Sequence, residues 1–166
     1  MNIRPATPTD AGTIAGVHVA TWQAAYRGLI PHSVLDALDV ESRAAFWHRL
    51  LSTTHHTFVA ESGTGIIGFC SLIPSRDGEA GVAEIAALYV TPAHWREGAG
   101  SALGSAAIRA AVEGGYSCIT LWVLAANSAA ISFYEAQGFS RDGATRTEET
   151  ASGVSLYEVH MKRQLP

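Results

Sequence analysis

The most restrictive pattern in this 166-residue sequence is an apolar strand followed by a glycine-bearing loop and a helix. Residues 83–90 are rich in strand-forming side chains, and residues 99–112 repeat apolar side chains at helical spacing. Gly98 and Gly100 stand where the helix begins, and glycine lets the backbone come close to a ligand there. The first amides of a helix lack intrahelical partners and lie at the positive end of its dipole. The segment is therefore a candidate site for a phosphate or diphosphate.

Several kinds of segment share this pattern. A glycine-bearing helix start that binds nothing is the plainest alternative. A dinucleotide-binding turn disagrees in detail, because Leu103 occupies the third glycine position and residues 119–124 end without the acid expected for a ribose. A Walker-type phosphate loop is excluded, since no Gly-Lys-Ser or Gly-Lys-Thr occurs. A diphosphate held by backbone amides alone, as in coenzyme A sites, agrees with the residues present.

The periodicity of the rest of the chain predicts one α/β domain over residues 1–166. Thr7 and Asp10 can form a capping box at the start of a first helix, and Gly28 and Pro31 break its pattern. Further helices are expected at 41–51, 99–112 and 127–137, and strands at 3–6, 57–60, 66–73, 83–90, 119–124, 139–146 and 155–161. The order β-α-α-β-β-β-α-β-α-β-β predicts a mixed sheet.

Composition and charge exclude several classes of protein. The formal net charge is -4, and no Lys/Arg cluster offers a surface for nucleic acid or an anionic membrane. No run approaches the ~18 apolar residues of a membrane span, and residues 1–5 lack the apolar stretch of a signal peptide. Cys70 and Cys118 lie in apolar runs, so we expect two buried reduced thiols in a cytoplasmic protein. We expect no metal site, because the histidines lack a metal-ligand spacing.

Two blocks of sequence resemble the GNAT superfamily of N-acetyltransferases. Residues 90–92 followed by 95–100 are similar to the main acetyl-CoA loop of that family. Asn127, then residues 133–134 and 138–139, are similar to its second conserved block. Two blocks in the right order are far more specific than one glycine loop. The chain departs from the family pattern at its tryptophan 95, where glutamine or arginine is usual.

The resemblance implies a single GNAT-like domain, with a mostly antiparallel sheet of about seven strands flanked by about four helices. Strands 83–90 and 119–124 would splay apart, with the pantetheine arm of acetyl-CoA between them and residues 97–102 at the diphosphate. The residues expected to bind the cofactor are Leu88, Tyr89, Val90, Trp95, Arg96, Glu97, Gly98, Ala99, Gly100, Ser101, Ala102, Asn127, Ala130, Phe133 and Tyr134. Family members often form dimers, so a homodimer is a further expectation.

Acetyl transfer to an amine needs a group that takes the amine proton and an acid for the leaving thiolate. Tyr134 matches the family tyrosine that faces the sulfur of coenzyme A, and we expect it to be the acid. Glu84 is the expected base, because it is a carboxylate in an otherwise apolar strand. The alternative for Glu84 is a charge at the strand edge, or one paired with a basic residue.

The aromatic residues Trp22 and Tyr26 fall in a region that usually helps to wall the acceptor pocket in this family, although such residues also pack into cores. The sequence thus predicts transfer of acetyl from acetyl-CoA to a primary amine. Because both cysteines lie in strand interiors, the transfer is expected to be direct. The acceptor stays open among small amines, amino acids, polyamines, antibiotics and protein N-termini. The rival hypothesis is a non-catalytic module that binds or senses acyl-CoA.

Overall fold

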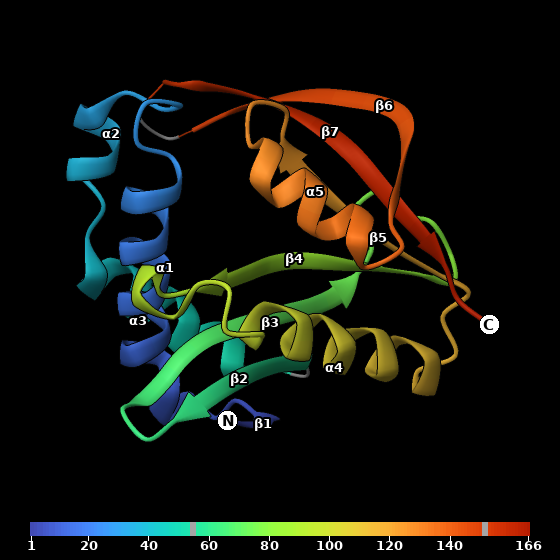
Figure 1. Cartoon of the computed structure of the whole chain (residues 1–166), viewed down its shortest axis with the longest axis horizontal. Helices are drawn as coiled ribbons and strands as arrows, with labels where there is room; N and C mark the ends of the chain where they lie inside the picture. Colours follow the sequence, from blue (N-terminus) through green and yellow to red (C-terminus); the bar gives the residue numbers. More distant parts are fainter. Residues whose placement is uncertain (54–55, 151–152) are drawn as a thin grey trace.

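The computed structural model describes residues 1–53, 56–150 and 153–166, and within these ranges seven strands form one sheet. The strands are β1 (Asn2–Pro5), β2 (His56–Ser62), β3 (Gly65–Pro74), β4 (Val82–Val90), β5 (Cys118–Leu124), β6 (Ser140–Glu149) and β7 (Ser155–Gln164). Their order across the sheet is β1-β2-β3-β4-β5-β7-β6, and β4–β5 is the parallel pair (Figure 1). The mostly antiparallel α/β sheet expected from the sequence is confirmed.

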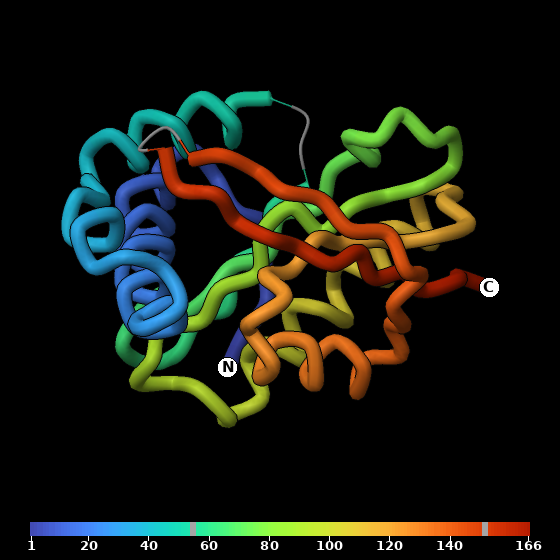
Figure 2. The backbone as a smooth tube through the Cα atoms, turned by 90° about the horizontal axis from the view of Figure 1, so that it is seen from above, coloured from blue at the N-terminus to red at the C-terminus, as the bar shows by residue number. Residues whose placement is uncertain are grey.

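Helices cover both faces of this sheet. They are α1 (Ala11–Ala25), α2 (His32–Asp36), α3 (Val40–Leu51), α4 (Ala99–Glu113) and α5 (Ser128–Ala136), with short 3-10 turns at Pro8–Asp10 and Pro92–His94. Figures 1 and 2 show α1 and α3 on one side of the strands and α4 and α5 on the other. In the described ranges, no helix is long and apolar enough to cross a membrane.

Local sequence explains where several helices begin. Thr7 and Asp10 form the expected capping box ahead of α1. Asn127 caps α5, because its side chain accepts from the Ala130 amide at 3.1 Å. The short helix α2 is absent from the sequence expectation, which treated Pro31 as a break. Pro31 is instead the N-cap of α2, a position where its missing N–H costs nothing.

Two apolar cores lie on opposite faces of the sheet, because side chains alternate along each strand. Val59 and Phe69 pack toward α1 and α3, where Ile14 and Trp47 complete one core. Their sequence neighbours belong to the other core, which lies under α4 and α5 and includes Leu103. The sheet is thus packed against helices on both faces.

The strands β4 and β5 pair at one end and separate at the other. Their parallel register runs from Val82–Cys118 to Glu84–Thr120, and no pairing follows. A bulge in β4 lies beside the point of separation, since Ser71 pairs with Ala87 and Leu72 with Ile85. Bulges bend and twist a strand locally. The second half of β4 therefore presents a backbone edge without a neighbouring strand.

Candidate active site

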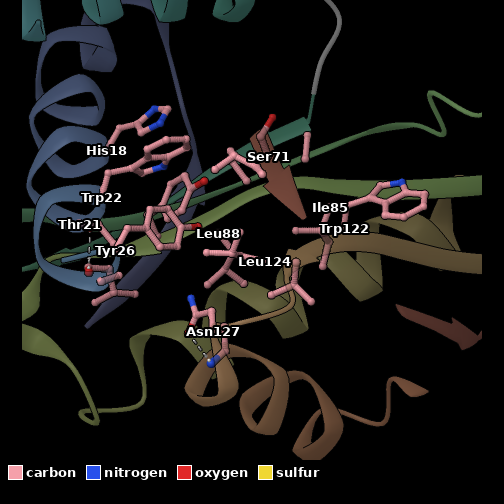
Figure 3. A pocket seen from close by; sticks show the side chains of 18 of the residues that line it. His18, Thr21, Trp22, Tyr26, Ser71, Ile85, Leu88, Trp122, Leu124 and Asn127 are labelled. Atoms are coloured by element: carbon pink, nitrogen blue, oxygen red, sulfur yellow. Dashed lines mark hydrogen bonds between the residues drawn. The ribbon is translucent and has the colours of Figure 1, made fainter. Parts of the chain in front are cut away.

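A cavity of about 1400 Å³ occupies the space where β4 and β5 separate. One half is lined by β4, β5, α5 and the loop before α4, and the other by α1, α2, α3 and parts of β6 and β7. Figure 3 shows Trp22 of α1 and Tyr26, the C-cap of that helix, on one wall, with Leu88, Leu124 and Asn127 toward the other. The two halves offer one binding space with chemically different walls.

Most of the residues expected from the sequence line this cavity. They are Trp22, Tyr26, Leu88, Tyr89, Val90, Trp95, Arg96, Gly98, Gly100, Ser101, Asn127, Ala130, Phe133 and Tyr134. Glu84, Glu97, Ala99 and Ala102 do not belong to the lining. The tertiary structure therefore brings together both sequence blocks, although they are far apart in the chain.

The first turn of α4 holds backbone amides that have no acceptor in the described chain. Gly98 is the N-cap with φ 89°, and no side chain caps the helix. The first bonded amide is that of Ala102, which donates to the Gly98 carbonyl at 3.0 Å. The amides of residues 98–101 thus point out of the helix at the positive end of its dipole, as an anion site requires.

The loop before α4 is also strained. Arg96 has φ 64°, which makes it the non-glycine residue with a left-handed backbone among those described. Such a conformation costs of order 1–2 kcal/mol and persists where the surroundings impose it. Arg96 also lines the cavity, next in sequence to the segment with the free amides.

Three residues of this segment that were expected to bind the cofactor do not line the cavity. The amide of Ala102 is bonded within the helix, and Ala99 is buried in the core. Glu97 lies 2.9 Å from the His94 imidazole, at the exposed surface. The candidate diphosphate contacts are therefore concentrated at Gly98, Gly100 and Ser101.

Trp95 closes one side of the mouth. Its indole N–H donates to the Val90 carbonyl at 2.6 Å, although the ring remains 45% exposed. The Thr21 hydroxyl donates to the same carbonyl at 3.0 Å. The tryptophan that replaces the usual glutamine or arginine thus ties the loop to the end of β4 and supplies an apolar surface.

Tyr134 of α5 lines the cavity. Its ring packs edge-on against Phe133 and Phe139, with ring centroids 5.1 and 5.8 Å away. Burial raises the pKa of the Tyr134 hydroxyl well above its ordinary value. The phenol therefore keeps its proton at neutral pH and can donate it.

Glu84 is held away from the cavity by an ion pair. Its side chain is fully buried, and both carboxylate oxygens accept hydrogen bonds from Arg76. The Arg76 side chain bonds one oxygen, with Nε at 3.0 Å, and the Arg76 amide bonds the other, also at 3.0 Å. This is the arrangement of the alternative interpretation, a strand carboxylate paired with a basic residue.

Glu158 of β7 is a cavity carboxylate that sequence reasoning missed. It lines the cavity and accepts a hydrogen bond from the Arg146 Nε at 2.7 Å. Burial raises its pKa, and the Arg146 charge acts against that rise. The signal was the period of two along β7: Leu156 and Glu158 share the face that lines the cavity, whereas Tyr157 points to solvent.

The α1 wall is aromatic and contains a buried imidazole. His18 stacks on Tyr89 with ring centroids 5.0 Å apart, and the Trp47 indole donates to His18 Nδ1 at 3.2 Å. Because Nδ1 accepts, the neutral ring carries its proton on Nε2, which is buried with no partner among the described residues. Burial, with a smaller effect of the Arg43 charge, lowers the pKa of His18 to about 3.

Stability is expected to fall in acid because His18 is buried in its neutral form. The unfolded chain binds a proton on this imidazole below pH ~6.5, whereas the folded chain does not until about pH 3. Its contribution is therefore lost as pH falls, at up to about 1.4 kcal/mol per pH unit. Urea titrations between pH 7 and 4 should show a shallower decline for His18→Gln, while the exposed His48→Gln keeps the wild-type slope. Parallel slopes for wild type and His18→Gln would contradict this assignment.

The cysteines offer no nucleophile to the cavity. Cys70 and Cys118 are both free and buried, as expected. Burial raises the pKa of the Cys70 thiol to about 12, so a thiolate is absent at neutral pH. In the part of the chain that the structure describes, no group of three or more His, Cys, Asp or Glu side chains could hold a metal ion.

A sheet split beside a helix with free N-terminal amides is the arrangement that the sequence resemblance to N-acetyltransferases implied. The model of the acetyltransferase (GNAT) family matches residues 19–139. The chain therefore belongs to the GNAT acetyltransferase family, as its two sequence blocks indicated.

Individual relatives agree with that assignment along the whole chain. The uncharacterized N-acetyltransferase YuaI of Bacillus subtilis is 30% identical over 161 residues, which cover 96% of this chain and 90% of the relative. The structure of yncA from Salmonella typhimurium with its cofactor acetyl-CoA is 25% identical, with a TM-score of 0.74 and coverage of 100% and 94%. The ribosomal-protein-alanine N-acetyltransferase of Brucella melitensis is 25% identical, with a TM-score of 0.77 and coverage of 99% and 100%.

Proposed function

We propose that this protein transfers an acetyl group from acetyl-CoA to a primary amine, and that the amine attacks the thioester directly. The observation that carries the proposal is the meeting of three features in one cavity: the free amides before residue 102, the unpaired edge of β4, and the Tyr134 phenol. The similar yncA structure holds acetyl-CoA. The buried Cys70 thiol supports direct transfer over a covalent acyl-enzyme.

The residues present fit the cofactor part by part. The amides of Gly98, Gly100 and Ser101 would hold the diphosphate, and a Cβ on Gly100 would stand 3.4 Å from Phe133, which leaves little spare room. The β4 edge beyond Glu84 offers backbone groups to the amides of the pantetheine arm. The thioester supplies the activated acetyl group. Tyr134 would give its proton to the departing thiolate.

The amine proton needs an acceptor in the same space. Of the two carboxylates considered, Glu158 lines the cavity, whereas Glu84 is fully buried, paired with Arg76 and outside the lining. A base must come within hydrogen-bonding reach of the proton it removes, directly or through one water. We therefore assign proton removal to Glu158, and a positioning role to Glu84 through its hold on Arg76.

Replacing Glu158 by glutamine is expected to lower kcat/KM about 100-fold, because general base catalysis contributes at least that much. Coenzyme A affinity should stay unchanged. The acidic limb of the wild-type pH profile, which lies above the ordinary carboxyl value because burial raises the Glu158 pKa, should disappear. Glu113→Gln is the control, since Glu113 is exposed at the end of α4 and lies outside the cavity lining.

Glu84→Gln should behave differently from Glu158→Gln. It removes the charge of a buried carboxylate that is paired with the half-exposed Arg76, and should lower the free energy of unfolding by about 1–3 kcal/mol. Its pH profile should keep the acidic limb. If Glu84→Gln abolishes that limb and Glu158→Gln preserves it, the two roles are exchanged and Glu84 is the base.

The overall activity is tested by thiol release from acetyl-CoA with a panel of amines. The panel contains amino acids, arylalkylamines, polyamines, aminoglycosides and peptides with a free N-terminus. The peptides are included because the Brucella relative is named for acetylation of a ribosomal-protein alanine. We expect amine-dependent release with an N-acetyl product detected by mass spectrometry. Tight coenzyme A binding without turnover on any amine would favour the sensing module instead.

A further inference from the structure

The half of the cavity lined by α1, α2, α3 and parts of β6 and β7, the acceptor half, has charged side chains at its border. Some of them form ion pairs and one does not. Arg76 is paired with Glu84, and Arg146 with Glu158. Arg43, on α3, also lines the cavity and is half-buried, yet it makes no ion pair with any residue that the structure describes. A cation partly removed from water without a counter-charge is costly, and it is explained when a ligand supplies the charge.

Hydrogen-bond donors without acceptors lie on the same wall. His18 is 7% exposed, and its Nε2 has no partner. The Trp22 Nε1 is also buried and makes no well-formed hydrogen bond, although the Tyr89 hydroxyl lies near enough to interact with it. Both residues line the cavity from α1, which packs directly against α3. The wall formed by α1 and α3 thus presents buried N–H groups without well-formed hydrogen bonds, and oxygen atoms of a ligand could accept from them.

The opposite charge stands elsewhere in the cavity. Glu158 lines it from β7 and is partly neutralised by Arg146. Burial is the main cause that raises the pKa of the Tyr89 hydroxyl, and contacts with Trp22 and Tyr26 oppose that rise. Smaller effects come from the Glu158 charge, which raises this pKa, and from the Arg43 charge, which lowers it, so Tyr89 lies within the electrostatic reach of both. Arg43 and Glu158 therefore act on a common space without being paired to each other.

From these contacts we propose that the acceptor is an amine that also bears a carboxylate, of the amino-acid class, with its carboxylate held by Arg43 and its amine directed toward Glu158. The proposal rests on the acetyltransferase function proposed above. Apolar side chains that line the same cavity, namely Val34, Leu38 and Phe46, give the rest of such a molecule an apolar surface. A polyamine would instead place a second cation near Arg43, which like-charge repulsion disfavours.

Binding of acetylated products tests this without relying on turnover. The probes are N-acetyl-L-leucine, N-acetyl-L-leucinamide and N-isoamylacetamide, which differ in having a carboxylate, an amide or neither. Analogous glycine and phenylalanine series and N-acetylspermidine complete the set. Calorimetry is performed on the full chain saturated with coenzyme A. We expect the carboxylate compound to bind at least 10-fold more tightly than its two neutral analogues in at least one series.

Arg43→Gln should remove that preference and leave the affinity for the neutral analogues unchanged. Arg49→Gln is the matched control, because Arg49 is an exposed residue of the same helix outside the cavity lining. Equal affinity across every series, tighter binding of N-acetylspermidine, or a preference that survives Arg43→Gln would each overturn the proposal. Thermal melting confirms that the variants are folded.

The two proposals fail in different ways. If the carboxylate preference is measured but no amine is acetylated, the subsite stands and the enzymatic function falls. If amines without a carboxylate are acetylated as efficiently as amino acids, the function stands and the Arg43 assignment falls.

Discussion

Replacing Tyr134 by phenylalanine is expected to reduce kcat about 100-fold while the Kd for coenzyme A changes less than about 2-fold. The change removes one hydroxyl and keeps the ring that packs between Phe133 and Phe139. No described residue hydrogen-bonds to that hydroxyl, so its loss should hardly affect stability. Proton donation by a positioned group contributes roughly 10²–10⁴-fold to a rate.

The measurement is a single-turnover rate with the best amine from the panel, because product release can hide a slower chemical step. Tyr116→Phe serves as the control, since Tyr116 packs against the core below α4 and is outside the cavity lining. A wild-type single-turnover rate for Tyr134→Phe would remove the phenol from the acid role and leave water to protonate the thiolate.

Gly100→Val is expected to weaken coenzyme A binding at least about 100-fold. A Cβ at this position is already in van der Waals contact with the Phe133 ring at 3.4 Å and with Leu88 at 3.8 Å, so the two γ-methyl groups of valine must extend beyond that contact. They would either displace Phe133 or occupy the mouth where the free amides meet the diphosphate. The peptide amide itself is retained, so the loss is steric.

Gly104→Ala is the matched control one turn further along α4. Its added Cβ meets Gln137 at 3.7 Å and Leu88 at 3.9 Å, which are ordinary contacts, and alanine favours helix by up to about 1 kcal/mol over glycine. This variant should therefore be at least as stable as wild type, with unchanged coenzyme A affinity by calorimetry. A folded Gly100→Val protein with wild-type affinity would mean that the diphosphate lies elsewhere.

The carboxylate proposed as the base shows what residue type and spacing in the sequence cannot predict. Glu84 stands out in the sequence because it interrupts an apolar strand, and the structure explains that interruption by Arg76, which lies 8 residues earlier and encloses it. Glu158 does not stand out, because a charged residue in a half-exposed terminal strand is unremarkable. Its position follows from pairing between β5 and β7, which places Leu124 opposite Glu158.

Local physics determined much of this protein from its sequence alone. Helix caps at Thr7 and Asn127, the period of two in the strands and the glycines before α4 act over a few residues, so the elements and the anion-binding turn can be read directly. Local sequence could not predict which charged side chains meet in the acceptor half of the cavity. Arg43 and Glu158 are more than a hundred residues apart, and only the packing of α3 and β7 around the split sheet decides which charges are paired and which face a ligand.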